Sequence, residues 1–146
     1  MADVATLATV ASVIAGFGAA ILVFRIQREL QAHEQLEPQW IPWADRLLIA
    51  ATLVALLLVL LPLVAASNRP GYMAQLPAAA CTAAICMVAG YILAILAHYR
   101  LIFGRRRSGP RVNPEPAEKW LVLVSIAAAV LLFAMALLRY PPPPEL

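Results

Sequence analysis

Four long apolar runs constrain this chain more than any other feature of its sequence. They cover residues 4–24, 47–66, 72–97 and 120–138, and none of them contains an Asp, Glu, Lys or Arg. At about 1.5 Å of rise per residue, a helix of such a length crosses the hydrocarbon core of a bilayer, which is about 30 Å thick. The runs are continuous, without the polar alternation of membrane-barrel strands. They predict an all-α integral membrane four-helix bundle.

The composition agrees with a membrane location. Hydrophobic residues make up 63% of the 146 residues and charged residues 13%, and the mean hydropathy is +0.82. A soluble fold of this size cannot hide so much apolar surface, so lipid has to cover it. We expect residues 1–146 to form a single transmembrane domain. A net charge of +3 provides no basic face for nucleic acid, which excludes that class of partner.

The distribution of basic residues predicts the orientation in the membrane. The loops 25–46 and 98–119 hold nine of the eleven Lys and Arg residues, and the opposite side holds only Arg69 and Arg139. Because basic residues in short loops are retained in the cytoplasm, both loops are predicted to be cytoplasmic and both termini to lie outside. The high content of Ala, Leu and Arg is typical of a high-GC bacterium. We therefore expect a bacterial inner-membrane protein.

Small residues recur at every fourth position in the first and third runs. Residues four apart share one face of a helix, and small side chains there let two helix backbones approach closely. We expect these faces to pack against each other, either within one chain or between protomers. The residues are Ala8, Ser12, Gly16 and Ala20 in the first run, and Thr82, Cys86, Gly90 and Ala94 in the third.

A weak internal repeat suggests two tandem helical hairpins. Ala-Gly-aromatic triplets occupy similar places at residues 15–17 and 89–91, and each is followed by Arg, then Glu-Pro, then Trp and an apolar run. Two hairpins of the same orientation would be related by an axis along the membrane normal. The spacing differs between the two halves, so chance similarity is the alternative explanation.

The two predicted cytoplasmic loops differ in character. Residues 25–37 are mostly good helix formers up to Pro38, which predicts that the first helix continues beyond the membrane. The third loop is rich in proline and carries a basic cluster, which would attract anionic lipid headgroups or an acidic partner beside the inner leaflet. The alternative is that these charges only enforce the topology. The basic cluster consists of Arg105, Arg106, Arg107 and Arg111.

The sequence contains no pattern that indicates a reaction. Nucleophile elbows, phosphate-binding loops and zinc motifs are absent. Glu29, His33 and Glu37 share a helical stripe, but two carboxylates and one imidazole are a weak metal-binding set, and the spacing equally suits salt bridges from Arg25 and Arg28. We interpret His98, just after the third run, as an interfacial side chain whose polar tip reaches water. We therefore expect no catalytic residue, no cofactor and no metal.

Two hypotheses for the function follow from these features. The first is a non-enzymatic subunit of a membrane assembly, which packs its small-residue helices against a second copy or another membrane protein. The second is a small oligomeric channel or transporter lined by the first helix through Thr9, Ser12 and Gly16. A chain of this size cannot easily enclose a solute path alone, so the second hypothesis requires an oligomer.

Overall fold

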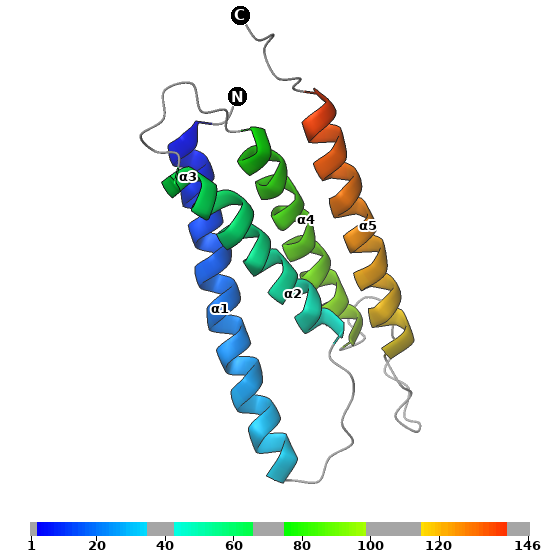
Figure 1. The fold of residues 1–146 in the computed structure, drawn as a ribbon. Coiled ribbons are helices and arrows are strands. Elements are labelled where there is room, and N and C mark those ends of the chain that lie inside the picture. Colours follow the sequence, from blue (N-terminus) through cyan, green and yellow to red (C-terminus); the bar gives the residue numbers. More distant parts are fainter. Residues whose placement is uncertain (1–2, 35–42, 66–74, 99–114, 140–146) are drawn as a thin grey trace, which may run out of the picture.

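The computed structural model describes residues 3–34, 43–65, 75–98 and 115–139, and nearly all of them are helical. Four helices in this part of the chain are long and apolar enough to cross a membrane, which confirms the predicted all-α, multi-pass membrane protein. Figure 1 shows the elements in order. They are α1 (Val4–Glu34), α2 (Trp43–Val54), the π-helix η1 (Ala55–Leu60), α3 (Leu61–Ala65), α4 (Gln75–His98) and α5 (Glu115–Arg139).

The first helix begins at an aspartate cap and extends past the others. The Thr6 backbone N–H donates a hydrogen bond of 2.5 Å to Asp3 Oδ1, as expected of a residue that caps a helix N-terminus. This hydrogen bond lowers the pKa of the Asp3 carboxyl below its usual value. At its other end α1 continues to Glu34 and reaches beyond the neighbouring helices (Figure 1), as the helix formers after Arg25 predict.

The second span is continuous from Trp43 to Ala65 but contains a widened turn. In the π-helix η1 the turn is wider than in an α-helix, and the Leu61 N–H donates to the carbonyl of Leu56, five residues earlier. Pro62 follows directly. Its ring has no N–H and would clash with the Leu58 carbonyl in a regular α-helix. The π-helical segment before the proline widens the turn and thereby relieves the clash that Pro62 would cause in a regular α-helix.

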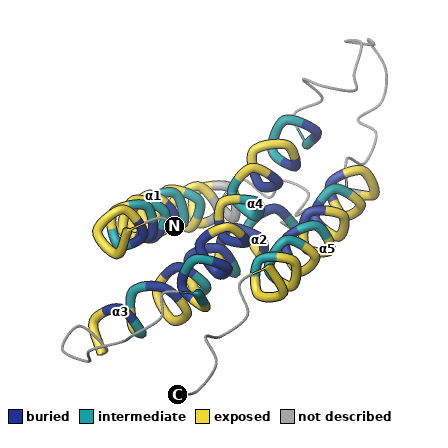
Figure 2. The backbone as a smooth tube through the Cα atoms, turned by 90° about the horizontal axis from the view of Figure 1, so that it is seen from above, coloured by how far each residue is buried: buried dark blue, intermediate teal, exposed yellow. Residues whose placement is uncertain are grey.

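The four spans form a bundle with two central and two outer helices. The most extensive contact is between α4 and α5, followed by that between α4 and α2, whereas α1 packs mainly against α2 and η1. Viewed from above, α1 and α5 lie on opposite sides of α2 and α4 (Figure 2). Contact between α1 and α4 is slight, so the expected pairing of the first and third runs is a minor contact within one chain.

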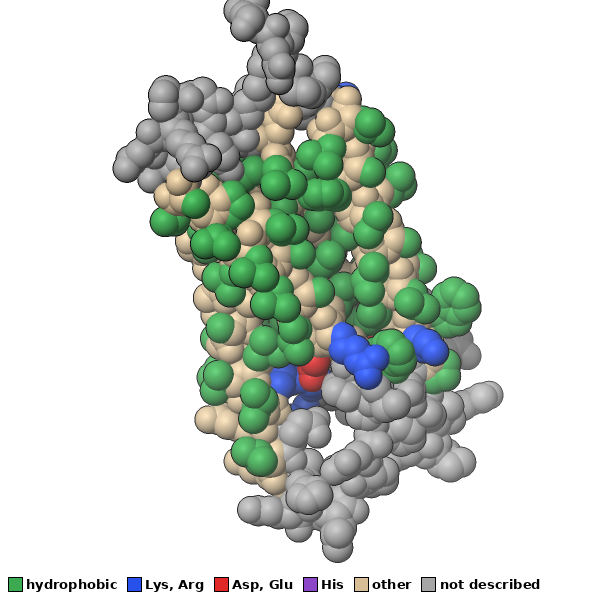
Figure 3. Space-filling model, in the orientation of Figure 1, with side chains coloured by type: hydrophobic (Ala, Val, Ile, Leu, Met, Phe, Trp, Pro, Cys, Tyr) green, Lys and Arg blue, Asp and Glu red, His purple; other side chains and the backbone are tan. Residues whose placement is uncertain are grey.

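The outer surface of the bundle suits a lipid environment. On the face seen in Figure 3, hydrophobic side chains cover the length of the helices, and charged side chains gather near one end. We call this the Trp43 end, where α2 begins and α4 finishes. The opposite end, where α1 begins and α5 finishes, is the Val4 end.

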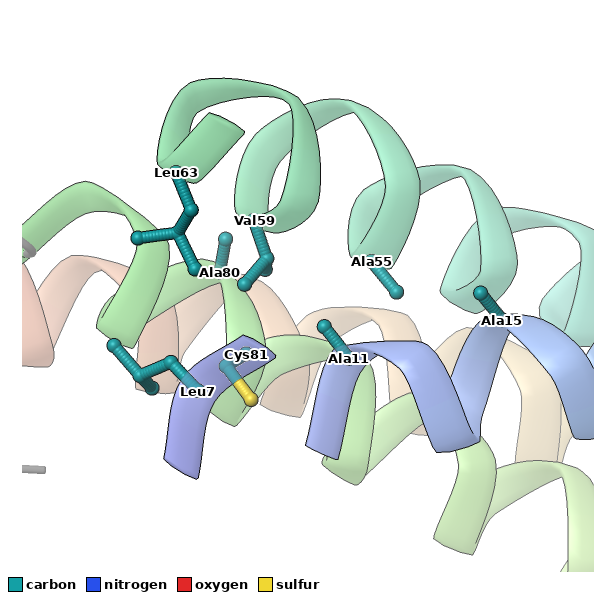
Figure 4. Close-up of a cluster of buried hydrophobic side chains, with 8 residues drawn as sticks. All are labelled: Leu7, Ala11, Ala15, Ala55, Val59, Leu63, Ala80 and Cys81. Atoms are coloured by element: carbon teal, nitrogen blue, oxygen red, sulfur yellow. The ribbon is translucent and has the colours of Figure 1, made fainter. Parts of the chain in front are cut away.

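The interior contains two clusters of mainly small or aliphatic side chains. Alanine is frequent in both, which lets the helices lie close together. The cluster toward the Val4 end joins α1, η1, α3 and α4 (Figure 4) and comprises Leu7, Ala11, Ala15, Ala55, Val59, Leu63, Ala80 and Cys81. The cluster toward the Trp43 end joins α2, α4 and α5 and comprises Ala44, Leu47, Leu48, Tyr91, Ala94 and Val122.

Candidate functional site

Two glycines mark the closest approaches between helices. A Cβ atom at Gly90 would overlap the side chain of Ser125 on α5 and would lie 3.1 Å from Leu47 Cδ2 on α2. A Cβ atom at Gly18 of α1 would overlap the Thr52 hydroxyl on α2. Both positions therefore need glycine because a neighbouring helix occupies the space. Gly18 was not among the predicted packing residues.

Several hydroxyl side chains inside the spans bond to their own helices, as their type predicts. Thr52 Oγ1 donates to the Leu48 carbonyl at 2.8 Å, and Ser125 Oγ donates to the Leu121 carbonyl at 2.7 Å. Among the described residues, every buried side-chain nitrogen or oxygen has a hydrogen-bond partner. Each of these two hydroxyls thus has a hydrogen-bond partner within its own helix and needs none from a neighbouring helix or a ligand.

Glu118 is the central residue of a polar cluster at the Trp43 end. Glu118 is only 1% exposed. Its Oε1 accepts a hydrogen bond of 2.7 Å from the Ala44 backbone N–H, and its Oε2 lies 2.7 Å from His98 Nδ1. The carboxylate satisfies an N–H in the first turn of α2, where the helix dipole favours negative charge. One side chain of α5 therefore joins the start of α2 to the end of α4.

A second ionic contact ties α1 to the same end of the bundle. The Nε–H of Arg25 is shared between Asp45 Oδ1 at 2.9 Å and Asp45 Oδ2 at 3.1 Å. The exposed fractions of these side chains are 17% and 13%. Asp45 lies in the first turn of α2, so it also stabilises that helix terminus. All four spans contribute to the polar cluster, which we define as Arg25, Ala44 N–H, Asp45, His98 and Glu118.

Trp43 lies beside this cluster and contacts two cations. The Arg46 guanidinium carbon lies 4.4 Å from the centroid of the indole ring, and the Lys119 ammonium lies 5.0 Å from it. Such cation–π contacts typically occur where an amphipathic ring lies between apolar and wet surroundings. The start of α2 and the start of α5 are thereby held together on the outside of the polar cluster as well.

The polar cluster corrects two sequence-based interpretations. His98 was expected to extend its tip to water, but its side chain is only 24% exposed and contacts Glu118. Glu118 and Asp45 were assigned to the loops 98–119 and 25–46, but both lie within helices that are long and apolar enough to span a membrane. The uncharged runs stop short of these residues because charge was used to define their ends. An acidic residue in the first turn of a helix was the signal that could have found them.

The predicted packing residues fall into different environments. On α4, Gly90 and Ala94 are buried, Cys86 is half-buried and Thr82 is exposed. On α1, Ala8 is half-buried, and the three others of the set are exposed. The buried face of α1 is formed instead by Leu7, Ala11, Ala15 and Gly18. A contact of Ser12, Gly16 and Ala20 with another protomer stays a prediction.

Other candidate residues lie outside the part of the chain that the structure describes. The basic cluster Arg105, Arg106, Arg107 and Arg111 falls there, as do Glu37 and the side chains of Glu29 and His33. Within the described ranges, no three His, Cys, Asp or Glu side chains are placed to hold a metal ion.

The described site is thus a set of interhelical contacts: two glycine-mediated approaches, a polar cluster at one end and an uncovered small-residue face on α1. Its groups are hydrogen-bonded to one another or to the backbone, an arrangement that holds helices together. Comparisons with known proteins do not add a family: no protein-family model, no curated protein and no solved structure matches the chain.

Proposed function

We propose that this multi-pass membrane protein is a non-enzymatic subunit of a membrane assembly, and that it packs against a second copy of itself. The contact surface is the α1 small face, defined as Ala8, Ser12, Gly16 and Ala20. The observation that carries the proposal is at Gly16, where a Cβ atom would meet nothing within 4 Å. The glycines at 18 and 90 face neighbouring helices, whereas Gly16 faces outward with the same lack of a side chain.

The chemistry of the two outer helices supports this choice of surface. The exposed side of α5 carries large aliphatic side chains, including Val124, Leu131 and Leu138, which suit contact with lipid chains. The α1 small face offers a shallow surface on which another backbone can come close, and van der Waals contact of this kind drives helix association in lipid.

The α1 small face is also chemically compatible with itself. It contains no charged residue, so two identical copies can meet without repulsion. In a two-fold dimer the same patch is used on both subunits, which requires such self-complementarity. A second copy is therefore the occupant that we propose, and a different membrane protein is the competing outcome of the test.

The test compares Gly16→Leu with Ala127→Leu. Gly16→Leu should leave the single-chain fold intact because the position is open, but it should separate the backbones of the two copies and abolish the dimer. Ala127 is exposed on α5, so the same enlargement there should leave the dimer unchanged. Native mass spectrometry of the detergent-solubilised protein gives the number of chains in each complex.

Two results would count against a homo-oligomer that forms through the α1 small face. A monomeric wild-type chain that carries a different membrane protein, lost in Gly16→Leu, would assign the α1 small face to that partner. A dimer of normal stability in Gly16→Leu would remove the α1 small face from the assembly altogether.

A channel formed by several copies is the second candidate. Thr9, Ser12 and Gly16 are exposed together on α1, so a ring of copies could turn these small polar residues toward a common lumen. Ion flux into vesicles that contain the purified protein separates this function from packing alone. Flux no greater than that of protein-free vesicles contradicts the channel.

The proposed location is a bacterial inner membrane, with the Trp43 end in the cytoplasm and both termini outside. The support comes from the nine Lys and Arg residues of the loops 25–46 and 98–119, since such loops are retained in the cytoplasm. On that side the basic cluster would meet anionic lipid headgroups.

A further inference from the structure

A groove runs along the outside of the bundle between α1 and α4 toward the Val4 end. It consists of two hollows of about 320 Å³ and about 340 Å³ that share Val10 and Ile85 in their walls. The hollows are adjacent because the same two side chains border both of them. Since α1 and α4 make only slight contact with each other, the two helices leave this space between them.

The lining of the groove changes from partly polar to almost wholly apolar along its length. The hollow nearer the Val4 end is bordered by Thr6, Gln75 and Thr82 among apolar residues. The other hollow is bordered by Val13, Ile14 and Val88, with Thr9 as its polar residue. The groove therefore has an amide and hydroxyl groups at the membrane boundary and a hydrocarbon lining deeper in the bilayer.

The length of the groove matches the depth of one leaflet. Along α4 its walls extend from Gln75 to Val88, and thirteen residues of helix rise about 20 Å. Half of the hydrocarbon core of a bilayer is about 15 Å thick. The groove thus begins at the headgroup region and ends near the bilayer midplane.

From this geometry we infer that the groove binds one acyl chain of a phospholipid from the leaflet at the Val4 end. The ester and headgroup region lies beside Gln75 and Thr6, and the chain descends past Val10 and Ile85 to Val88. Water does not suit the deeper hollow because a buried water needs two to four polar partners.

The lipid site can be tested separately from the proposed dimer. On α1 the groove is bordered by Thr6, Thr9, Val10, Val13 and Ile14, of which Thr9 and Val13 lie beside the α1 small face. Its opposite wall belongs to α4, which is not part of that face. Thr82→Phe on α4 therefore tests lipid binding without changing the contact between copies.

The test uses the full chain reconstituted into vesicles of phosphatidylcholine and phosphatidylglycerol, then extracted in mild detergent for native mass spectrometry. We expect one phospholipid retained per wild-type chain. Thr82→Phe fills the groove from an exposed position, and the loss of about ten van der Waals contacts with the acyl chain should reduce retention about tenfold. Val13→Trp at the deeper hollow should act in the same direction. The matched control is Ala127→Phe on the exposed side of α5, which should retain the lipid.

Circular dichroism of each variant shows whether the helices are intact. The two groove substitutions are in different helices, so if one variant misfolds, the other still tests the lipid site. Retention unchanged in a folded Thr82→Phe or Val13→Trp chain would overturn the lipid site. It would also be overturned by a wild-type chain without bound lipid, or by a Thr82→Phe chain that loses a second copy instead of a lipid.

Discussion

At the scale of single residues, Glu118 is the side chain whose removal should matter most for stability. It is buried, and its two oxygens contact the Ala44 N–H and His98. Glu118→Ala leaves both of these groups without their partner, which costs about 2–4 kcal/mol. Glu118→Gln retains an oxygen for the Ala44 N–H and should lose less. Unfolding in mixed micelles of increasing denaturing detergent measures both changes.

The comparison between the two Glu118 variants decides what the residue contributes. A loss in Glu118→Ala that is largely absent in Glu118→Gln assigns the stability to the hydrogen bond at the start of α2. Equal losses in both variants assign it to the negative charge beside His98. Wild-type stability in both would show that the polar cluster does not hold the helices together.

At the scale of helices, the sequence predicts the spans well and their neighbours poorly. The four apolar runs locate the four spans because lipid imposes the same requirement, an uncharged length, on each of them. The actual starts of α2 and α5, at Trp43 and Glu115, lie earlier than 47 and 120. The first turn of a helix can hold carboxylates, since the unpaired N–H groups there can donate hydrogen bonds to them.

The choice of packing faces shows a limit of periodicity. Gly16 and Gly18 lie two positions apart on α1, and both satisfy the expectation of a small residue at a helix contact. Only the structure shows that Gly18 meets Thr52 while Gly16 is open. The face that packs within the chain is decided by the approach of α2, which depends on residues far away in sequence. The polar cluster was missed for the same reason, because its members come from four separate helices.

At the scale of the whole molecule, the polar cluster makes the two ends of the bundle unequal. Each span contributes to this cluster at the Trp43 end. The Val4 end is held by the apolar cluster around Ala11 and Val59, and the α1–α4 groove opens toward it. The bundle is therefore tied by directional contacts at one end and by close packing at the other. This asymmetry agrees with a lipid-accessible groove in one leaflet.

The orientation of this asymmetric bundle can be measured directly with single cysteines. Ser67 and Ser108 lie outside the described residues; in the sequence Ser67 follows α3, which ends at the Val4 end, and Ser108 follows α4, which ends at the Trp43 end. If loops rich in Arg remain in the cytoplasm, a membrane-impermeant maleimide added to intact cells should label Ser67→Cys but not Ser108→Cys. After the cells are opened, both variants should react. The native chain is the control, because Cys81 is buried and Cys86 half-buried within α4, and it should give only background labelling. Labelling of Ser108→Cys in intact cells would invert the proposed topology and place the polar cluster at the outer face.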